Sequence, residues 1–143
     1  MKILKKLFGK SDVKIHVDEI ADSNKRLLGS SVIVAEGSNA NGQWIKFGDG
    51  TMICQTRLTL GPISGATGAL FQSENIQWTY PQKFIDSKVM LEGFVQYGTA
   101  GAWIASSSTN SNESMCVFRL MCSISAASTN IGTNLVAHGR WKE

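Results

Sequence analysis

From residue 31 to the C-terminus, short hydrophobic runs are separated by clusters of glycine, asparagine and serine. Apolar and polar side chains alternate within several of these runs, as expected for β-strands with one buried face. Short strands divided by turn residues are typical of a β-sandwich or a β-barrel. The pattern therefore predicts an all-β domain with antiparallel strands near 31–36, 43–47, 51–60, 75–80, 88–97, 101–105, 115–125 and 134–142.

The longest of these runs shows the two faces of a strand clearly. One face carries Met52, Cys54, Leu58 and Leu60, and the other carries Thr51, Gln55, Arg57 and Thr59, with Ile53 as an apolar exception. The run 88–97 alternates in the same way, but Met90 and Phe94 place apolar side chains on its second face as well. We therefore expect a second sheet to cover one side and a neighbouring subunit to cover the other.

Glycine-containing turns flank the short aromatic strand at 43–47. Asn39-Ala-Asn-Gly42 precedes it and Gly48-Asp-Gly50 follows it. Asp-Gly is a strong hairpin signal, because both residues tolerate positive φ angles. The turns predict a tight β-meander that carries Trp44 and Phe47.

The first 30 residues have a different pattern, which divides the chain into an N-terminal attachment or stalk segment (1–30) and a sandwich domain (31–143). Residues 1–10 space apolar side chains as a helix does, among four lysines. This segment is either a short basic helix that docks on a partner or a membrane surface, or a frayed solubilising terminus.

The stretch that follows resembles a short coiled coil. Val13, Val17, Ile20, Asn24 and Leu27 are spaced by four, three, four and three residues, and an Asn at an a position can fix register and oligomeric state. This repeat spans only two heptads, and its first five residues also alternate like a strand. A helical stalk and an extended segment therefore both remain open.

Composition and charge narrow the class of protein. A chain of 143 residues forms one ordinary domain, and its 17% of charged residues is well below the about 25% of an average soluble domain. The first 28 residues hold seven Lys and Arg against four acids, which accounts for the whole net charge of +3. The rest of the chain is neutral, so it offers no basic face for a phosphate backbone. Nucleic acid is therefore not an expected partner, and no apolar run approaches the length of a membrane span.

The cysteines and the N-terminus indicate synthesis in a reducing cytoplasm. Cys54, Cys116 and Cys122 are odd in number and lack C-x-x-C spacing, so neither a disulfide framework nor a zinc site is indicated. Each lies in an apolar run and is expected to pack as a small hydrophobic side chain. The first ten residues lack the uninterrupted apolar core of a signal peptide.

No motif predicts catalysis. Neither His16 nor His138 accompanies a nucleophile motif, and residues 61–68 lack the lysine of a phosphate-binding loop. A carboxylate pair for glycoside cleavage needs two acids about 5 to 10 Å apart, which spacing along a β-chain cannot test. The available acids are Asp49, Glu74, Asp86, Glu92 and Glu113. A depolymerising glycosidase is the third class of function considered, but we expect no enzymatic activity, no metal and no cofactor.

Three passages resemble the C-terminal tip domain of bacteriophage tail fibres. The first is Glu36-Gly-Ser-Asn-Ala-Asn-Gly-Gln-Trp-Ile-Lys-Phe-Gly-Asp-Gly-Thr-Met-Ile-Cys-Gln55. The others are Ile76-Gln-Trp-Thr-Tyr-Pro-Gln-Lys-Phe84 and the ending Val136-Ala-His-Gly-Arg-Trp-Lys142. The resemblance covers residues 31–143. The chain has its own Met1 and no long shaft, so both a small separate virion protein and the distal piece of a longer fibre remain open.

The resemblance implies a β-sandwich similar in pattern to H-type lectins, made in the bacterial host cytoplasm and assembled in the virion as a homotrimer. It implies a fibre tip that binds a host-surface glycan, either lipopolysaccharide or capsule, and contacts other virion proteins through its N-terminal segment. The alternative is a structural virion component, such as a capsid decoration or fibre-attachment protein, that contacts only other virion proteins.

A glycan site needs an aromatic face for the sugar ring and amides or hydroxyls for its OH groups. One stretch of the chain offers both kinds of group, and a loop held by a rigid sandwich is a usual place for binding residues. Its candidate residues are Tyr97, Trp103, Ser108, Asn110 and Asn112. The same stretch can equally be a solvated loop beside a Trp103 that belongs to the core.

Overall fold

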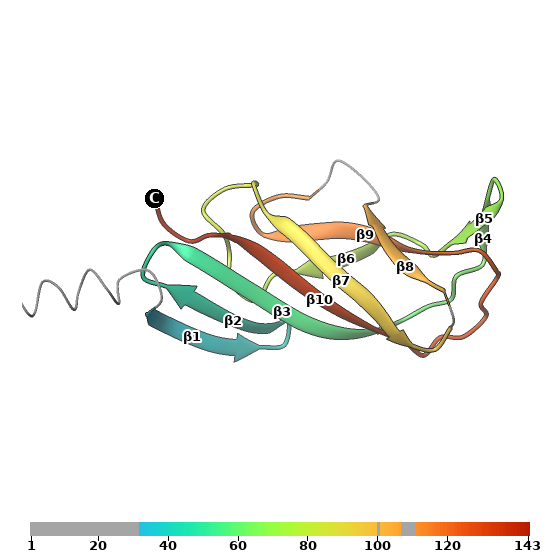
Figure 1. The fold of residues 1–143 in the computed structure, drawn as a ribbon, viewed down its shortest axis with the longest axis horizontal. Helices are drawn as coiled ribbons and strands as arrows, with labels where there is room; N and C mark the ends of the chain where they lie inside the picture. The colour runs from blue at the N-terminus through green and yellow to red at the C-terminus, as the bar shows by residue number, and fades with distance from the viewer. Residues whose placement is uncertain (1–31, 100, 107–110) are drawn as a thin grey trace, which may run out of the picture.

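The structure is a computed structural model that describes residues 32–99, 101–106 and 111–143 (Figure 1). Within these ranges the chain is all-β and contains no helix, so no described segment forms a helix that could span a bilayer. The strands are β1 (Ile33–Asn39), β2 (Gly42–Phe47), β3 (Thr51–Leu60), β4 (Gly65–Thr67), β5 (Leu70–Gln72), β6 (Ile76–Thr79), β7 (Met90–Tyr97), β8 (Trp103–Ser106), β9 (Met115–Cys122) and β10 (Ile131–Arg140).

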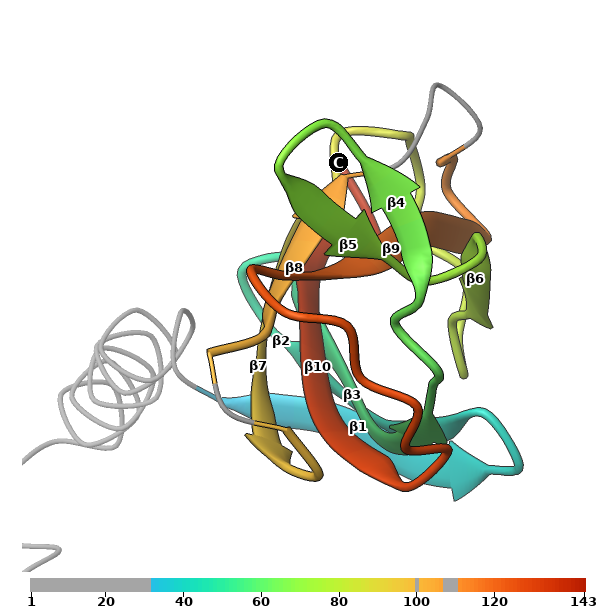
Figure 2. The same cartoon turned by 90° about the vertical axis from the view of Figure 1, so that its right-hand side faces the viewer.

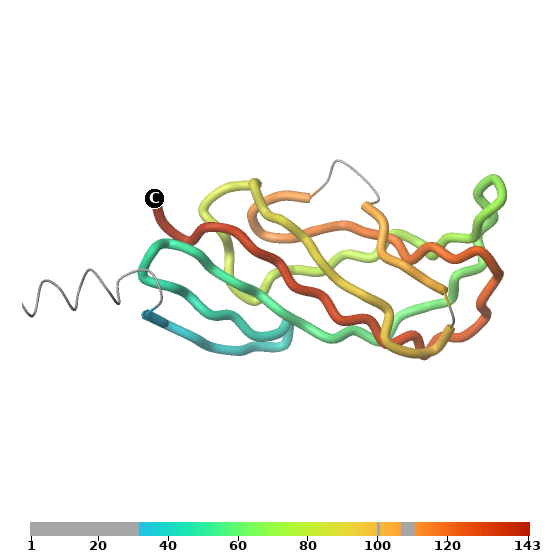
Figure 3. The backbone as a smooth tube through the Cα atoms, in the orientation of Figure 1, coloured from blue at the N-terminus to red at the C-terminus, as the bar shows by residue number. Residues whose placement is uncertain are grey.

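Two antiparallel sheets form the two layers of a sandwich. The first sheet has the strand order β1-β2-β3-β10-β7. The second has the order β4-β5-β9-β6, and β8 also pairs with β9. Figures 1 and 2 show β9 crossing over β10 in the other layer. The start of β1 and the C-terminus lie at one end of the molecule, and the β4–β5 hairpin lies at the opposite end (Figure 3). The predicted all-β antiparallel sandwich is confirmed.

The core lies between the sheets and is built from the alternating positions of β3, β9 and β10. Phe118, Leu120, Ile131 and Leu135 are almost completely buried there, and the three cysteines are free and buried among them. Trp78, Tyr80 and Phe84 extend this core as two successive edge-to-face pairs, with ring centroids 5.2 and 5.0 Å apart. The expectation that the cysteines pack as small hydrophobic residues is confirmed.

The structure contains all eight predicted strands, with ends that differ by a few residues. It adds a hairpin that the sequence pattern did not predict, formed by the three-residue strands β4 and β5. Strands this short contain too few positions to show a period of two. The predicted meander is confirmed, because β1, β2 and β3 pair in sequence order through the two expected turns. Gly42 lies at φ +132°, where a side chain would collide with the Gln55 carbonyl.

The predicted attachment segment lies outside the described residues. This includes the coiled-coil candidates Val13, Val17, Ile20, Asn24 and Leu27. The division of the chain at residue 30 therefore stays a prediction.

Candidate functional site

A row of amide side chains crosses the outer face of the first sheet. Gln43 on β2 lies opposite Gln55 on β3, and the Gln55 Nε2 donates a hydrogen bond of 3.0 Å to the Gln43 Oε1. Further along, the Asn134 Nδ2 on β10 donates to the Gln96 Oε1 on β7 at 3.2 Å. These four residues, here called the amide row, come from four neighbouring strands and face away from the core because the strands alternate.

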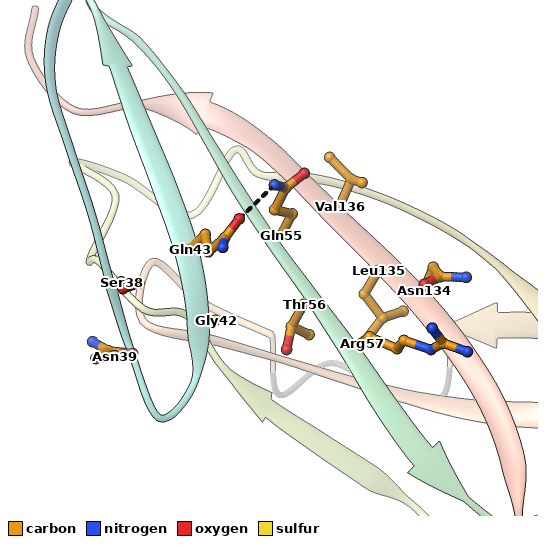
Figure 4. A pocket seen from close by; sticks show the side chains of 10 residues that line it. All are labelled: Ser38, Asn39, Gly42, Gln43, Gln55, Thr56, Arg57, Asn134, Leu135 and Val136. Atoms are coloured by element: carbon orange, nitrogen blue, oxygen red, sulfur yellow. Dashed lines mark hydrogen bonds between the residues drawn. The ribbon is translucent and has the colours of Figure 1, made fainter.

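Three members of the amide row, Gln43, Gln55 and Asn134, line a groove of about 510 Å³ (Figure 4). The groove forms where β2 begins at Gly42, since β3 continues past Gln55 without a partner on that side. It is lined by Ser38, Asn39, Gly42, Gln43, Gln55, Thr56, Arg57, Asn134, Leu135 and Val136. Amides and hydroxyls dominate this lining, and Arg57 is the one charged residue among the described side chains that form it. The groove can therefore offer many hydrogen bonds to a polar ligand.

Arg57 is held at the groove by Tyr97. The Arg57 guanidinium carbon lies 5.3 Å from the centroid of the Tyr97 ring, which is a cation–π arrangement. The Tyr97 ring in turn covers Gly132, where any side chain would collide with it. Tyr97 remains 40% exposed, so its ring and the Arg57 head are both open to a ligand.

The structure separates the two aromatic residues proposed as a glycan platform. Trp103 lies on β8, opposite Met121 of β9. Because Leu120 and Cys122 beside Met121 face the core, Trp103 lies on the outer face of the second sheet and is 42% exposed. Tyr97 lies on the outer face of the first sheet.

The polar candidates have different positions. The Asn112 Oδ1 accepts hydrogen bonds from the amides of Ser114 and Met115 at 2.8 and 3.2 Å, so Asn112 stabilises a turn. Asn112 also lines a second hollow of about 360 Å³ together with Ser106 and Ser111. Ser108 and Asn110 lie outside the described residues.

Trp103 has its own polar neighbours on the second sheet. Met121 pairs with Gln72 of β5 on its other side, and Arg119 donates to the Gln72 Oε1 at 2.8 Å and to the Asn75 Oδ1 at 2.6 Å. The Arg119 guanidinium on this face is therefore already hydrogen-bonded to two side chains of the protein. The guanidinium of Arg57 has no such partner among the described residues, which makes the first sheet the stronger candidate for ligand binding.

Sequence reasoning identified Tyr97 but missed the amide row and Arg57. The polar face of the strand at 51–60 was the available signal, since Gln55 and Arg57 both lie on it. That signal indicated a solvent-exposed face, but it did not show which residues of β2, β7 and β10 lie beside it. Those neighbours depend on the register between strands. The register is set by turn geometry and by which faces are buried, and neither is known until the strand pairing is known.

Two of the described acidic side chains, Asp49 and Glu113, make local structural contacts. The Asp49 Oδ1 accepts a hydrogen bond from the Thr51 amide at 2.8 Å, which lowers the pKa of that carboxyl group. A hydrogen bond from its own backbone amide and a contact of 3.1 Å with the Lys83 ammonium lower the pKa of Glu113. Within the ranges that the structure describes, no three His, Cys, Asp or Glu residues form a metal-binding group.

No family model and no curated protein matches the sequence. Two solved structures share the fold. An N-truncated R1-type pyocin tail fibre matches with a TM-score of 0.53 and 18% identity, over 83% of this chain and 95% of that chain. A Pseudomonas aeruginosa R1 pyocin fibre comprising C-terminal residues 323–701 matches with a TM-score of 0.52 and 17% identity, over 83% of this chain and 31% of that chain. The chain therefore has a tail-fibre-like fold, while the likeness to H-type lectins stays a prediction.

Proposed function

We propose that this chain is a virion protein of the tail-fibre type that binds a glycan on the surface of the bacterial host and does not cleave it. The fold similarity to two pyocin fibres supports the tail-fibre part of this proposal. The groove beside the amide row is the observation that carries the binding part.

The chemistry of this groove suits a sugar polymer. Neighbouring hydroxyl groups of a sugar bind well to amides, which donate and accept at once, and three members of the amide row, Gln43, Gln55 and Asn134, line the groove. Beside the groove, the exposed part of the Tyr97 ring adds apolar surface that the apolar side of a pyranose can contact.

The lining supports binding rather than cleavage. A glycosidase of the usual kind needs two carboxyl groups on either side of the scissile bond. None of the described residues that line the groove is acidic. We therefore propose a non-catalytic receptor-binding role.

We further propose that the protein acts as a homotrimer. Met90 and Phe94 on the outer face of β7 are 62% and 60% exposed in the single chain. Two large apolar side chains on one sheet face favour contact with a second protein surface. A neighbouring subunit would bury these two side chains, as the apolar residues on both faces of this strand predict.

Titration with polysaccharide tests the proposed function. The full chain is titrated calorimetrically with lipopolysaccharide and capsular polysaccharide purified from a panel of bacterial strains, and the polymer length is measured before and after. We expect saturable binding to at least one glycan with no shortening. Gln55→Ala should weaken this binding about tenfold, equivalent to about 1.4 kcal/mol.

A matched control locates the site. Gln77→Ala removes an exposed amide from the second sheet and should leave the affinity unchanged. If Trp103→Phe weakens binding instead of Gln55→Ala, the site lies on the second sheet and the groove assignment is wrong. If no glycan binds, the protein is a structural virion component, and if the polymer shortens, it is an enzyme.

A further inference from the structure

The charge of Arg57 is unbalanced within the groove. The other nine lining residues are uncharged, and Arg57 makes no ion pair with any described carboxylate. Two acids lie near the groove on this face without lining it: Glu92 is opposite the lining residue Val136, and Glu36 is on β1, two residues before the lining residue Ser38. The groove therefore presents a net positive charge to whatever occupies it.

The contact with Tyr97 restrains the position of this charge before a ligand arrives. The Tyr97 ring centroid lies 5.3 Å from the guanidinium carbon, and the absence of a side chain at Gly132 lets the ring pack closely against β10. Asn134 lies opposite Arg57 in the register of β3 and β10, with its own amide held by Gln96. A guanidinium stacked on an aromatic ring loses little further freedom when it binds, which favours tight and selective contacts.

A stacked guanidinium with free N–H groups recognises a planar carboxylate or a phosphate through two parallel hydrogen bonds. The amides around Arg57 match hydroxyl groups rather than further negative charge. The combination indicates one negative group carried on a polyhydroxylated chain. We infer that the groove selects acidic glycans, and that Arg57 binds the carboxylate of a uronic acid or the phosphate of a phosphorylated sugar.

This inference rests on the proposed glycan-binding function and is tested on the same two classes of probe. The lipopolysaccharide and the capsular polysaccharide are each used in native form, after chemical reduction of their carboxyl groups, and after removal of their phosphates. We expect the native form of the bound glycan to bind at least tenfold more tightly than one of its treated forms. The treatment that removes binding identifies the source of the negative charge.

Variants of Arg57 assign the charge selection to this side chain. Arg57→Gln should abolish the difference between native and treated glycan, while Arg57→Lys should keep part of it because it keeps the charge but not the paired hydrogen bonds. Lys88→Gln makes the same change in net charge at an exposed position away from the groove and should leave the difference intact. Thermal unfolding of each variant checks that it is folded.

The outcomes separate the inference from the proposed function. If native and treated glycans bind equally, or if Arg57→Gln keeps the preference for the native form, the selection of acidic glycans is wrong while glycan binding stands. If neither class of glycan binds in any form, both the proposed function and this inference are wrong.

Discussion

Among single residues, the buried Cys54 and Cys116 show how an apolar environment affects a thiol. Their place in apolar runs indicated packing rather than a disulfide or a zinc site, and the structure confirms this. Burial raises the pKa of Cys54 from 9.0 to about 11, and it also raises that of Cys116. Within the part of the chain that the structure describes, the Cys54 thiol donates one long hydrogen bond, of 3.6 Å, to the Gln82 carbonyl oxygen. The thiols of Cys54 and Cys116 are therefore protonated and inert at neutral pH.

The raised pKa of Cys54 predicts weaker stability in alkali. An unfolded chain loses this proton near pH 9, whereas the folded chain keeps it until about pH 11. The folded state then binds more protons than the unfolded state, so the free energy of unfolding falls as the pH rises between these values. The contribution of this group is at most about 1.4 kcal/mol per pH unit.

Urea unfolding under reducing conditions at pH 7.0, 9.0 and 10.5 measures this fall. Cys54→Ala lowers stability at every pH because it leaves a cavity, but its stability should decline less steeply above pH 9. An equal decline in both proteins would show that Cys54 does not cause it.

A second residue-scale prediction concerns Gly132 and Tyr97. Gly132→Ala places a methyl group against the Tyr97 ring, and overpacking of this kind typically costs about 1–3 kcal/mol. In a Tyr97→Ala background the same change should cost much less, because the ring is gone. Urea unfolding of the wild type, the two single variants and the double variant gives the coupling energy. A cost that is the same in both backgrounds would mean that the ring does not lie over Gly132.

Among the elements, the β1–β2 hairpin holds the groove in place because it is tied to the other sheet. The Trp78 Nε1 of β6 donates to the Asn41 carbonyl at 2.9 Å, and the Asn39 Nδ2 donates to the Pro81 carbonyl at 2.8 Å. The Asn39 Oδ1 also accepts from the Asn41 amide at 2.9 Å within the turn. One asparagine therefore shapes the turn and joins the two layers.

Asn39→Asp separates these two roles, since it keeps the acceptor for the Asn41 amide and loses the donor to Pro81. We expect a loss of about 1 kcal/mol in the free energy of unfolding and faster hydrogen exchange in β1 and β2 than in β9. Gln77→Glu makes the same chemical change at an exposed position and serves as the control. Unchanged exchange in β1 and β2 would contradict the role of the bond to Pro81.

The elements also show what the sequence could and could not predict. The turns around Asn41 and Asp49 contain residues that favour hairpins, so the meander and its order were predictable. The β4–β5 hairpin was not, since its strands are too short for an alternation. The pairing of Arg57 with Asn134 was not predictable either. The two residues are separated by 76 residues of chain, and no local signal sets the register of their strands.

At the scale of the whole molecule, the outer face of β7 predicts an assembly. Met90→Ser and Phe94→Ser together should reduce the mass of the particle in solution without lowering the stability of the subunit, because both side chains are exposed in the single chain. Sedimentation equilibrium of the full chain should give three times 15.5 kDa, and the double variant should give a smaller mass. A monomeric wild type would contradict the homotrimer.

We propose that this protein binds a bacterial surface through a glycan. The most direct test is the binding of the fluorescently labelled full chain to intact cells of a panel of bacterial strains, either untreated, oxidised with periodate or treated with protease. We predict saturable binding to at least one strain, which periodate abolishes and protease leaves unchanged. Binding that survives periodate and disappears with protease, or no saturable binding to any strain, would contradict this account.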